Sequence, residues 1–151
     1  MPRRNSLNVE YNTEILWLNR YFKRSTSNPR YSCLEQMIID RKEELFHPYF
    51  ETDINKGFKT NKRVTPEALR RLELEEGDTL LRKYQTWLKV IDKHIKTSDK
   101  GMVNLIKDVY INKYTTLEVA ANKHLHYSRS VAYLKVGDWL EELNTAFFNA
   151  R

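Results

Sequence analysis

Turn-forming residues are scarce in this chain, and their scarcity limits the folds that it can adopt. Only four glycines and four prolines occur in 151 residues, whereas a β-sandwich or barrel needs turn residues at short intervals. Charged residues make up 30% of the chain, and apolar residues recur between them at helical spacing. The sequence therefore predicts an all-α fold.

Three regions follow from the spacing of the predicted helices. Residues 1–65 are expected to form a helical amino-terminal region, and residues 66–96 a connecting or core helix. This helix has a predicted break near Gly77–Asp78. Residues 97–151 are expected to form a three-helix DNA-binding domain of the helix-turn-helix type.

In the amino-terminal region, Thr13 is a candidate N-cap for a first helix. A second helix is predicted from about Ser32 to Phe46, with Cys33 on its inward face and Pro48 as its stop. The stretch from Tyr49 to Thr65 lacks helical periodicity and is rich in Lys and Arg. We expect it to be a mobile, basic loop, and Thr65 to cap the helix that follows.

The carboxy-terminal region contains two marked helix starts. Thr115-x-x-Glu118 matches a capping box, in which the hydroxyl and the carboxylate bond to free backbone N–H groups. Ala120 and Ala121 follow and would let the next helix cross closely. Ser128 is the expected cap of that next helix.

The last helix has one apolar stripe and a polar opposite side in its first turns. The stripe includes Ala132 and Val136, and the polar side is expected to carry Arg129 and Tyr133. A helix in a major groove presents its amino-terminal side chains to base edges. The predicted base-contacting or phosphate-contacting residues of this helix are Arg129, Ser130, Tyr133 and Lys135.

The distribution of charge also points to the carboxy-terminal region as a binding surface. The net charge of the chain is +6, and the window from Lys100 to Lys135 holds six Lys or Arg residues and two acidic ones. A basic window of this kind suits a DNA duplex. The candidate contacts outside the last helix are Lys107, Lys113, Lys123 and Thr116.

Several classes of protein are not favoured by the sequence. The chain has one cysteine, no apolar run long enough to cross a membrane and no signal-peptide pattern, so a cytoplasmic location is expected. His124-x-His126 is more readily a turn than a metal pair. No catalytic constellation, metal site or cofactor motif stands out, and we expect neither an enzyme nor a cofactor.

The chain resembles the late-gene transcriptional activators of phages of Gram-positive bacteria, the RinA, ArpU and LtrC type. The resemblance covers residues 28–148. It rests on Pro29-x-Tyr31, Arg41-x-Glu43, Pro48, Thr52-Asp-Ile-Asn-Lys-Gly57, Tyr110-Ile-Asn-Lys113, Thr116-Leu-Glu-Val-Ala-Ala121 and His126-Tyr-Ser-Arg129. Where family members often have a second glycine after the Asp-x-Asn-x-Gly loop, this chain has Phe58.

The resemblance implies a helix-turn-helix like region four of sigma factors. It also implies activation of the phage packaging and structural genes, with double-stranded DNA as ligand and host RNA polymerase as partner. By position, the recognition residues would be Arg129, Ser130, Tyr133 and Lys135. An inhibitory protein and a homo-oligomer remain open as further partners.

Two alternatives stay open. One is an oligomeric DNA-packaging subunit like the small terminase, which also combines a helix-turn-helix with helical extensions. The other, less favoured, is a nuclease, for which Asp40, Glu43 and Glu44 would be the candidate metal-binding acids.

Overall fold

The computed structural model describes the backbone of residues 7–60 and 64–150, and the side chains of residues 7–46 and 70–150. Within those ranges the chain forms helices and no sheet; an isolated antiparallel bridge joins Arg24 to Ser32. The all-α prediction is confirmed.

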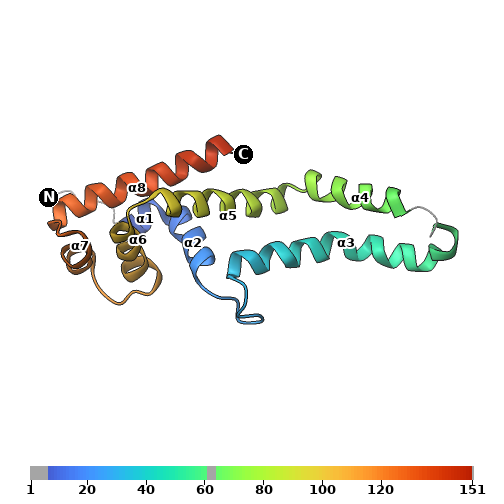
Figure 1. Ribbon diagram of the computed structural model, residues 1–151, viewed down its shortest axis with the longest axis horizontal. Coiled ribbons are helices and arrows are strands. Elements are labelled where there is room, and N and C mark those ends of the chain that lie inside the picture. Colours follow the sequence, from blue (N-terminus) through green and yellow to red (C-terminus); the bar gives the residue numbers. More distant parts are fainter. Residues whose placement is uncertain (1–6, 61–63, 151) are drawn as a thin grey trace.

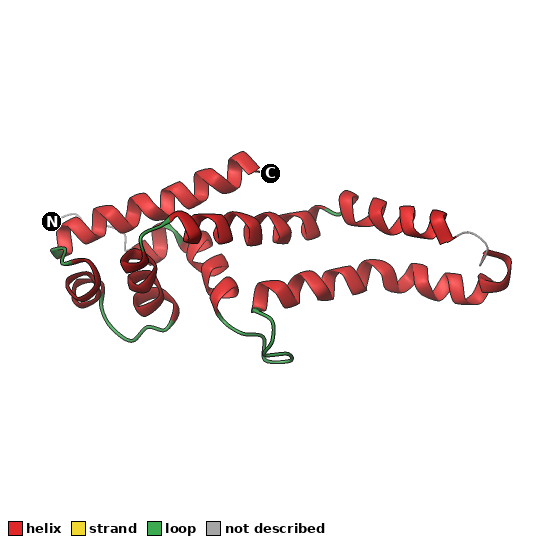
Figure 2. Ribbon diagram, viewed as in Figure 1, coloured by secondary structure: helices red, strands yellow, loops and turns green. Residues whose placement is uncertain are grey.

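The helices run in the order shown in Figure 1, with short loops between them (Figure 2). They are α1 (Leu7–Glu10), α2 (Asn12–Phe22), α3 (Cys33–Thr60), α4 (Val64–Gly77), α5 (Thr79–Thr97), α6 (Lys100–Ile106), the π-helical segment η1 (Lys107–Ile111), α7 (Leu117–Leu125) and α8 (Arg129–Ala150).

The molecule is elongated. α3 runs beside α4 and α5 in the opposite direction, forming a long hairpin, and α8 packs along α5 (Figure 1). α6, η1 and α7 gather at the far end of the molecule from the tip of the hairpin. α2 lies between these parts, since it contacts α3, α5, η1 and α8.

A stack of three aromatic rings holds α2, α5 and α8 together. Trp87 of α5 lies between Trp17 of α2, at a centroid distance of 5.5 Å, and Phe147 of α8, at 4.1 Å. The rings of both pairs are nearly parallel, at 10° and 9°. Trp87 is 2% exposed. Burial of such large rings is the main stabilising term for this junction.

The predicted basic loop from Tyr49 to Thr65 is wrong for most of its length. α3 continues past Pro48 to Thr60, and α4 already begins at Val64. Proline fixes φ near −65°, which is a helical value, so a helix can pass through it at the loss of one backbone hydrogen bond. The antiparallel packing of α3 on α4 favours helix in a stretch whose own periodicity is weak.

The start of α2 also differs from its prediction. The helix begins at Asn12 and its N-cap position is Tyr11, so Thr13 lies inside the first turn. Cys33, expected in the core, is half-buried, and its thiol donates to the Arg24 carbonyl at 3.4 Å. The start of α3 is the better-formed one, because Ser32 and Glu35 exchange hydrogen bonds in a capping box, at 3.1 and 3.0 Å.

The predicted break at Gly77–Asp78 is confirmed. A partly buried ion pair between Asp78 and Arg41 holds the chain in place there. Asp78 caps α5 by accepting from the Leu81 N–H at 2.7 Å. The Arg41 guanidinium of α3 donates to both Asp78 oxygens, at 2.9 and 2.7 Å. These hydrogen bonds hold the pKa of Asp78 below its ordinary value. One carboxylate therefore caps α5 and fastens it to α3.

The carboxyl end of α5 is joined to α8 by a small hydrogen-bonded group. His94 Nε2 lies 3.1 Å from the Trp139 carbonyl, and the two rings are 4.4 Å apart. The Trp139 indole N–H donates to the Ser98 hydroxyl at 2.8 Å, and that hydroxyl donates to the His94 carbonyl. Burial lowers the pKa of His94, while the Trp139 carbonyl and Glu142 oppose the shift.

This arrangement predicts a loss of stability in weak acid. Since the pKa of His94 is lowered in the folded chain, the unfolded chain takes up this proton at a higher pH. The stabilising contribution is full above the ordinary histidine pKa of about 6.5 and declines as the pH falls through the lowered value. Urea unfolding at about pH 7.5 and about pH 5.5 should show a smaller loss for His94→Gln than for the unchanged chain. Glutamine can still donate to the Trp139 carbonyl, so an equal loss in both proteins would contradict the role of His94.

Candidate nucleic-acid interface

α6 with η1, α7 and α8 form a three-helix unit. α7 packs on α6 and on α8. Its inward residues, Ala120 and Ala121, are fully buried, as is Ala132 on α8. Side chains of this size let helices cross at short distance. The prediction that two alanines would form the contact face of this helix is confirmed.

The contact between α6 and α7 leaves no space for a side chain at Gly101. A Cβ there would lie 2.7 Å from Leu125 Cδ2 and 2.9 Å from the His124 carbonyl oxygen. A second link joins η1 to the same part of α7, because His124 Nε2 lies 2.6 Å from Asp108 Oδ2. His124 thus has a carboxylate partner inside the three-helix unit, and the carboxyl end of α7 is held against both α6 and η1.

The start of α7 lies one residue later than predicted. Thr116, and not Thr115, occupies the N-cap, and its hydroxyl accepts from the Val119 N–H at 3.4 Å. The backbone conformation identifies the N-cap, because an N-cap residue has non-helical dihedral angles and Thr116 has φ −87° and ψ 164°. Thr116, a candidate DNA contact, therefore already uses its hydroxyl in the cap.

A short turn leads from α7 to α8. α7 ends at Leu125, and His126 adopts a left-handed conformation with φ 57°. The Tyr127 N–H then bonds back to the Ala121 carbonyl at 3.2 Å, which closes the helix end. Ser128 accepts from the Val131 N–H at 3.4 Å, so its predicted role as the cap of α8 is confirmed. The turn is three residues long.

The apolar stripe predicted for α8 is also confirmed. Its buried residues are Ala132, Val136, Trp139, Leu140, Leu143 and Phe147. Arg129, Ser130 and Lys135 of the predicted set are exposed. Tyr133 is half-buried and packs against the hydrophobic core. Arg129 and Tyr133 therefore do not lie on the side opposite the stripe, because at 100° per residue Tyr133 falls at its edge and Arg129 falls in line with it. Arg129 is exposed at the first position of the helix.

The side of α8 that does face away from the core contains two apolar residues that are not among the predicted contacts. Val131 is 39% exposed and Leu134 is 63% exposed. The signal was present in the sequence, since a stripe through residues 132, 136, 140 and 143 leaves 131, 134 and 135 on the outside.

The predicted lysine contacts differ in their surroundings. Lys113, in the loop before α7, and Lys123, on α7, are exposed. Neither forms an ion pair with another residue that the structure describes. Lys107 is half-buried, and its ammonium lies 5.3 Å from the centre of the Phe22 ring. Lys113 and Lys123 are therefore the better placed to meet a phosphate backbone.

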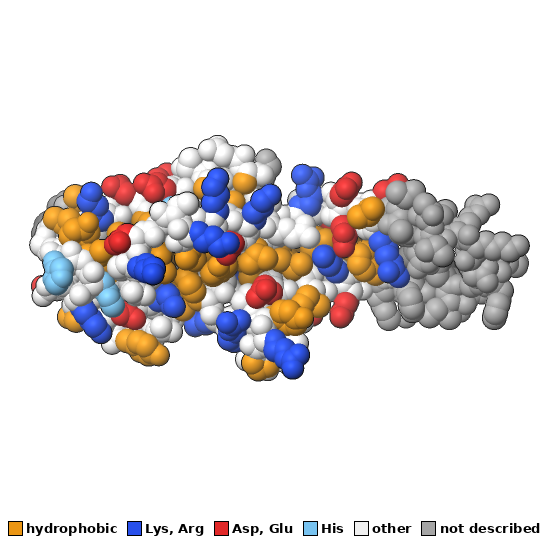
Figure 3. Space-filling model, in the orientation of Figure 1, with side chains coloured by type: hydrophobic (Ala, Val, Ile, Leu, Met, Phe, Trp, Pro, Cys, Tyr) orange, Lys and Arg blue, Asp and Glu red, His pale blue; other side chains and the backbone are white. Residues whose placement is uncertain are grey.

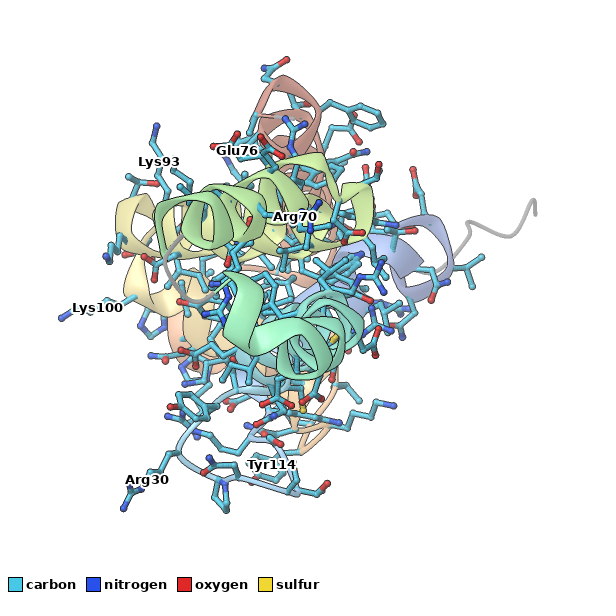
Figure 4. All side chains as sticks on the ribbon, turned by 90° about the vertical axis from the view of Figure 1, so that its right-hand side faces the viewer. Arg30, Arg70, Glu76, Lys93, Lys100 and Tyr114 are labelled. Carbon is cyan, nitrogen blue, oxygen red and sulfur yellow. The ribbon has the colours of Figure 1, made fainter. Side chains whose placement is uncertain are left out.

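A second group of cations lines a groove between α5 and α8. Arg82, Lys89 and Lys93 lie on one side of α5, and no acidic residue of the described chain lines the same groove. In the view of Figure 3, Lys and Arg side chains are spread over the molecule among apolar patches and acidic side chains. In Figure 4, Lys93 and Lys100 project to the same side of the molecule. The spacing of 82, 89 and 93 could have revealed the stripe.

Two of the three candidate metal-binding acids of α3 have other partners. Asp40 accepts from the Gln36 amide at 2.8 Å, and Glu44 pairs with Arg41 at 2.8 Å. Among the residues with described side chains, no three His, Cys, Asp or Glu residues are grouped as metal ligands. In the same part of the chain, no helix has the length and apolar character needed to cross a membrane.

Comparison with known proteins yields no relative. No protein-family model, no curated protein sequence and no solved structure matches this chain.

Proposed function

We propose that this protein is a sequence-specific DNA-binding transcriptional regulator, with α6–η1, α7 and α8 as a helix-turn-helix and α8 as its recognition helix. One observation carries the proposal. A three-residue turn after α7 leads into a long, capped helix whose first turns expose Arg129, Ser130 and Lys135.

The chemistry of these residues suits a duplex. Arg129 can donate two hydrogen bonds to a guanine edge, and Ser130 can bond to a base or a phosphate. The amino terminus of α8 has free N–H groups and a partial positive charge, both of which attract phosphate. Lys113 and Lys123 add charge at the flanks of the same unit.

The resemblance to phage late-gene activators supports a more specific proposal. The protein would activate packaging and structural genes in the cytoplasm of an infected or lysogenic bacterium, acting with host RNA polymerase. The residues of that resemblance include the α7 cap at Thr116, the two alanines of α7 and Arg129.

Replacing Arg129 by alanine tests the proposal. The duplex that the full chain prefers would be selected from a random library, and binding to it and to a scrambled duplex would be measured at one salt concentration. If Arg129 contacts a base, its loss should reduce the discrimination between the two duplexes by about 1–3 kcal/mol. Folding should be unaffected, because Arg129 is exposed.

The matched control is Arg30→Ala, which removes the same charge from an exposed position in the loop between α2 and α3. It should leave the discrimination unchanged. If Arg129→Ala weakens both duplexes equally, Arg129 contacts only phosphate. If it alters neither, α8 is not the recognition helix.

A DNA-packaging subunit is the second candidate. The hairpin of α3 with α4 and α5 extends far from the three-helix unit (Figure 1), as the helical extension of an oligomeric subunit would. Sedimentation of the full chain separates the two candidates, because a ring-like assembly would favour packaging and a monomer or dimer would favour regulation.

A further inference from the structure

The outward side of α8 has an apolar surface that the core does not explain. Leu134 is 63% exposed, although Leu140 and Leu143 of the same helix are fully buried. Val131, 39% exposed, lies one turn before it, so the two side chains are neighbours on the helix surface. Single exposed apolar residues are common on proteins, but this pair occupies the first turns of the proposed recognition helix.

The polar neighbours of this pair restrict what can meet it. Ser130 and Lys135 are exposed beside Val131 and Leu134. Hydroxyl and ammonium groups suit phosphates and the polar edges of bases. The surface therefore combines polar groups for a nucleic acid with a small apolar centre.

In the major groove, the apolar group that a base pair offers is the C5 methyl of thymine. The edges of guanine and cytosine present only hydrogen-bonding groups there. Covering those groups with Val and Leu side chains would remove their water without replacing its hydrogen bonds, which is unfavourable.

We propose that Val131 and Leu134 contact thymine methyl groups, so that the preferred duplex contains thymine opposite the first two turns of α8. The proposal rests on the proposed function, because it assumes that this side of α8 enters the major groove. It adds the chemical feature of the DNA that the helix recognises.

Deoxyuridine provides the test, because it differs from thymidine only in lacking the C5 methyl. The duplex selected with the full chain would be prepared with deoxyuridine at each thymidine position in turn, and its dissociation constant measured at fixed salt. At one or two positions affinity should fall by about fourfold, the value of one buried methyl group. In Leu134→Ala the substitution should have little effect at the position that Leu134 covers, since the side chain that contacts that methyl is gone.

Phe148→Ala is the matched control. Phe148 is also an exposed apolar residue of α8, at 56%, but it lies about 21 Å further along the helix. This variant should keep the full difference between thymidine and deoxyuridine. Circular dichroism would verify that both variants remain folded.

The outcomes separate the two proposals. Equal affinity for all thymidine and deoxyuridine duplexes, with sequence preference retained, overturns the methyl contact and leaves the regulator proposal standing. If no duplex is preferred in the selection, the proposal of a sequence-specific regulator is wrong, and the methyl contact is wrong with it. If Leu134→Ala changes the oligomeric state but not the thymidine preference, the surface is a protein interface and the methyl contact is wrong.

Discussion

Replacing Trp87 by alanine should lower the free energy of unfolding by about 3–5 kcal/mol, the range for a large aromatic residue removed from a core. Trp87 is 2% exposed and stacks on Trp17 and Phe147. Its loss would leave a cavity where α2, α5 and α8 meet. Urea unfolding followed by far-ultraviolet circular dichroism would measure the change.

Trp87→Phe is the variant to compare with Trp87→Ala. The Trp87 indole N–H is buried and has no hydrogen-bond partner among the described residues, and an unpaired buried donor is itself unfavourable. Phenylalanine keeps an aromatic ring between the other two and removes that donor. It should therefore cost much less stability than alanine. Similar losses for both substitutions would show that the ring stack contributes little.

A triple substitution of Lys113, Lys123 and Lys135 by glutamine should flatten the salt dependence of DNA binding. All three side chains are exposed around the proposed interface. Each phosphate contact adds about 0.9 to the slope of log affinity against log salt, so three contacts add about 2.7. Between about 50 and 200 mM salt, the affinity of the unchanged chain should then fall by about 40-fold more than that of the variant.

Lys107 provides the control for this measurement. Lys107 is half-buried with its ammonium over the Phe22 ring, so Lys107→Gln should change the slope much less than any of the three. A triple variant with the slope of the unchanged chain would show that the duplex binds elsewhere. The groove of α5 with Arg82, Lys89 and Lys93 would then be the first alternative.

Some of this molecule could be predicted from the sequence because local signals and packing agree there. The buried stripe of α8 follows from its 3.6-residue periodicity, and the Ser128 cap follows from the preference of hydroxyl residues for that position. The break at Gly77–Asp78 was predictable for a similar reason, since glycine weakens a helix and aspartate begins one.

The helix beyond Pro48 could not be predicted in this way. Nothing in its own sequence marks it strongly as helix, and its support comes from packing against α4, the next helix of the hairpin. Packing of one helix on another overrides local preference, and a single sequence does not reveal that packing.

The position of Tyr133 shows a finer limit. Its spacing from Arg129 predicted a shared outward side, but four residues turn a helix by about 40° more than one full turn. For a residue near the edge of an apolar stripe, that rotation determines whether its side chain is exposed or packs against the core. The neighbouring elements settle it, since Tyr133 packs against the core cluster that includes Tyr110 of η1.

α8 takes part in two regions of the fold, the three-helix unit and the junction with α2 and α5. Its first turns bear Arg129 and Lys135, whereas its last turns supply Phe147 to the ring stack with Trp87. The far end of the helix is anchored on the stacked rings of Trp87 in α5 and Trp17 in α2. The proposed DNA-facing part therefore depends on the rest of the chain: placed in another protein without α2 and α5, it would lose the support that sets the direction of α8.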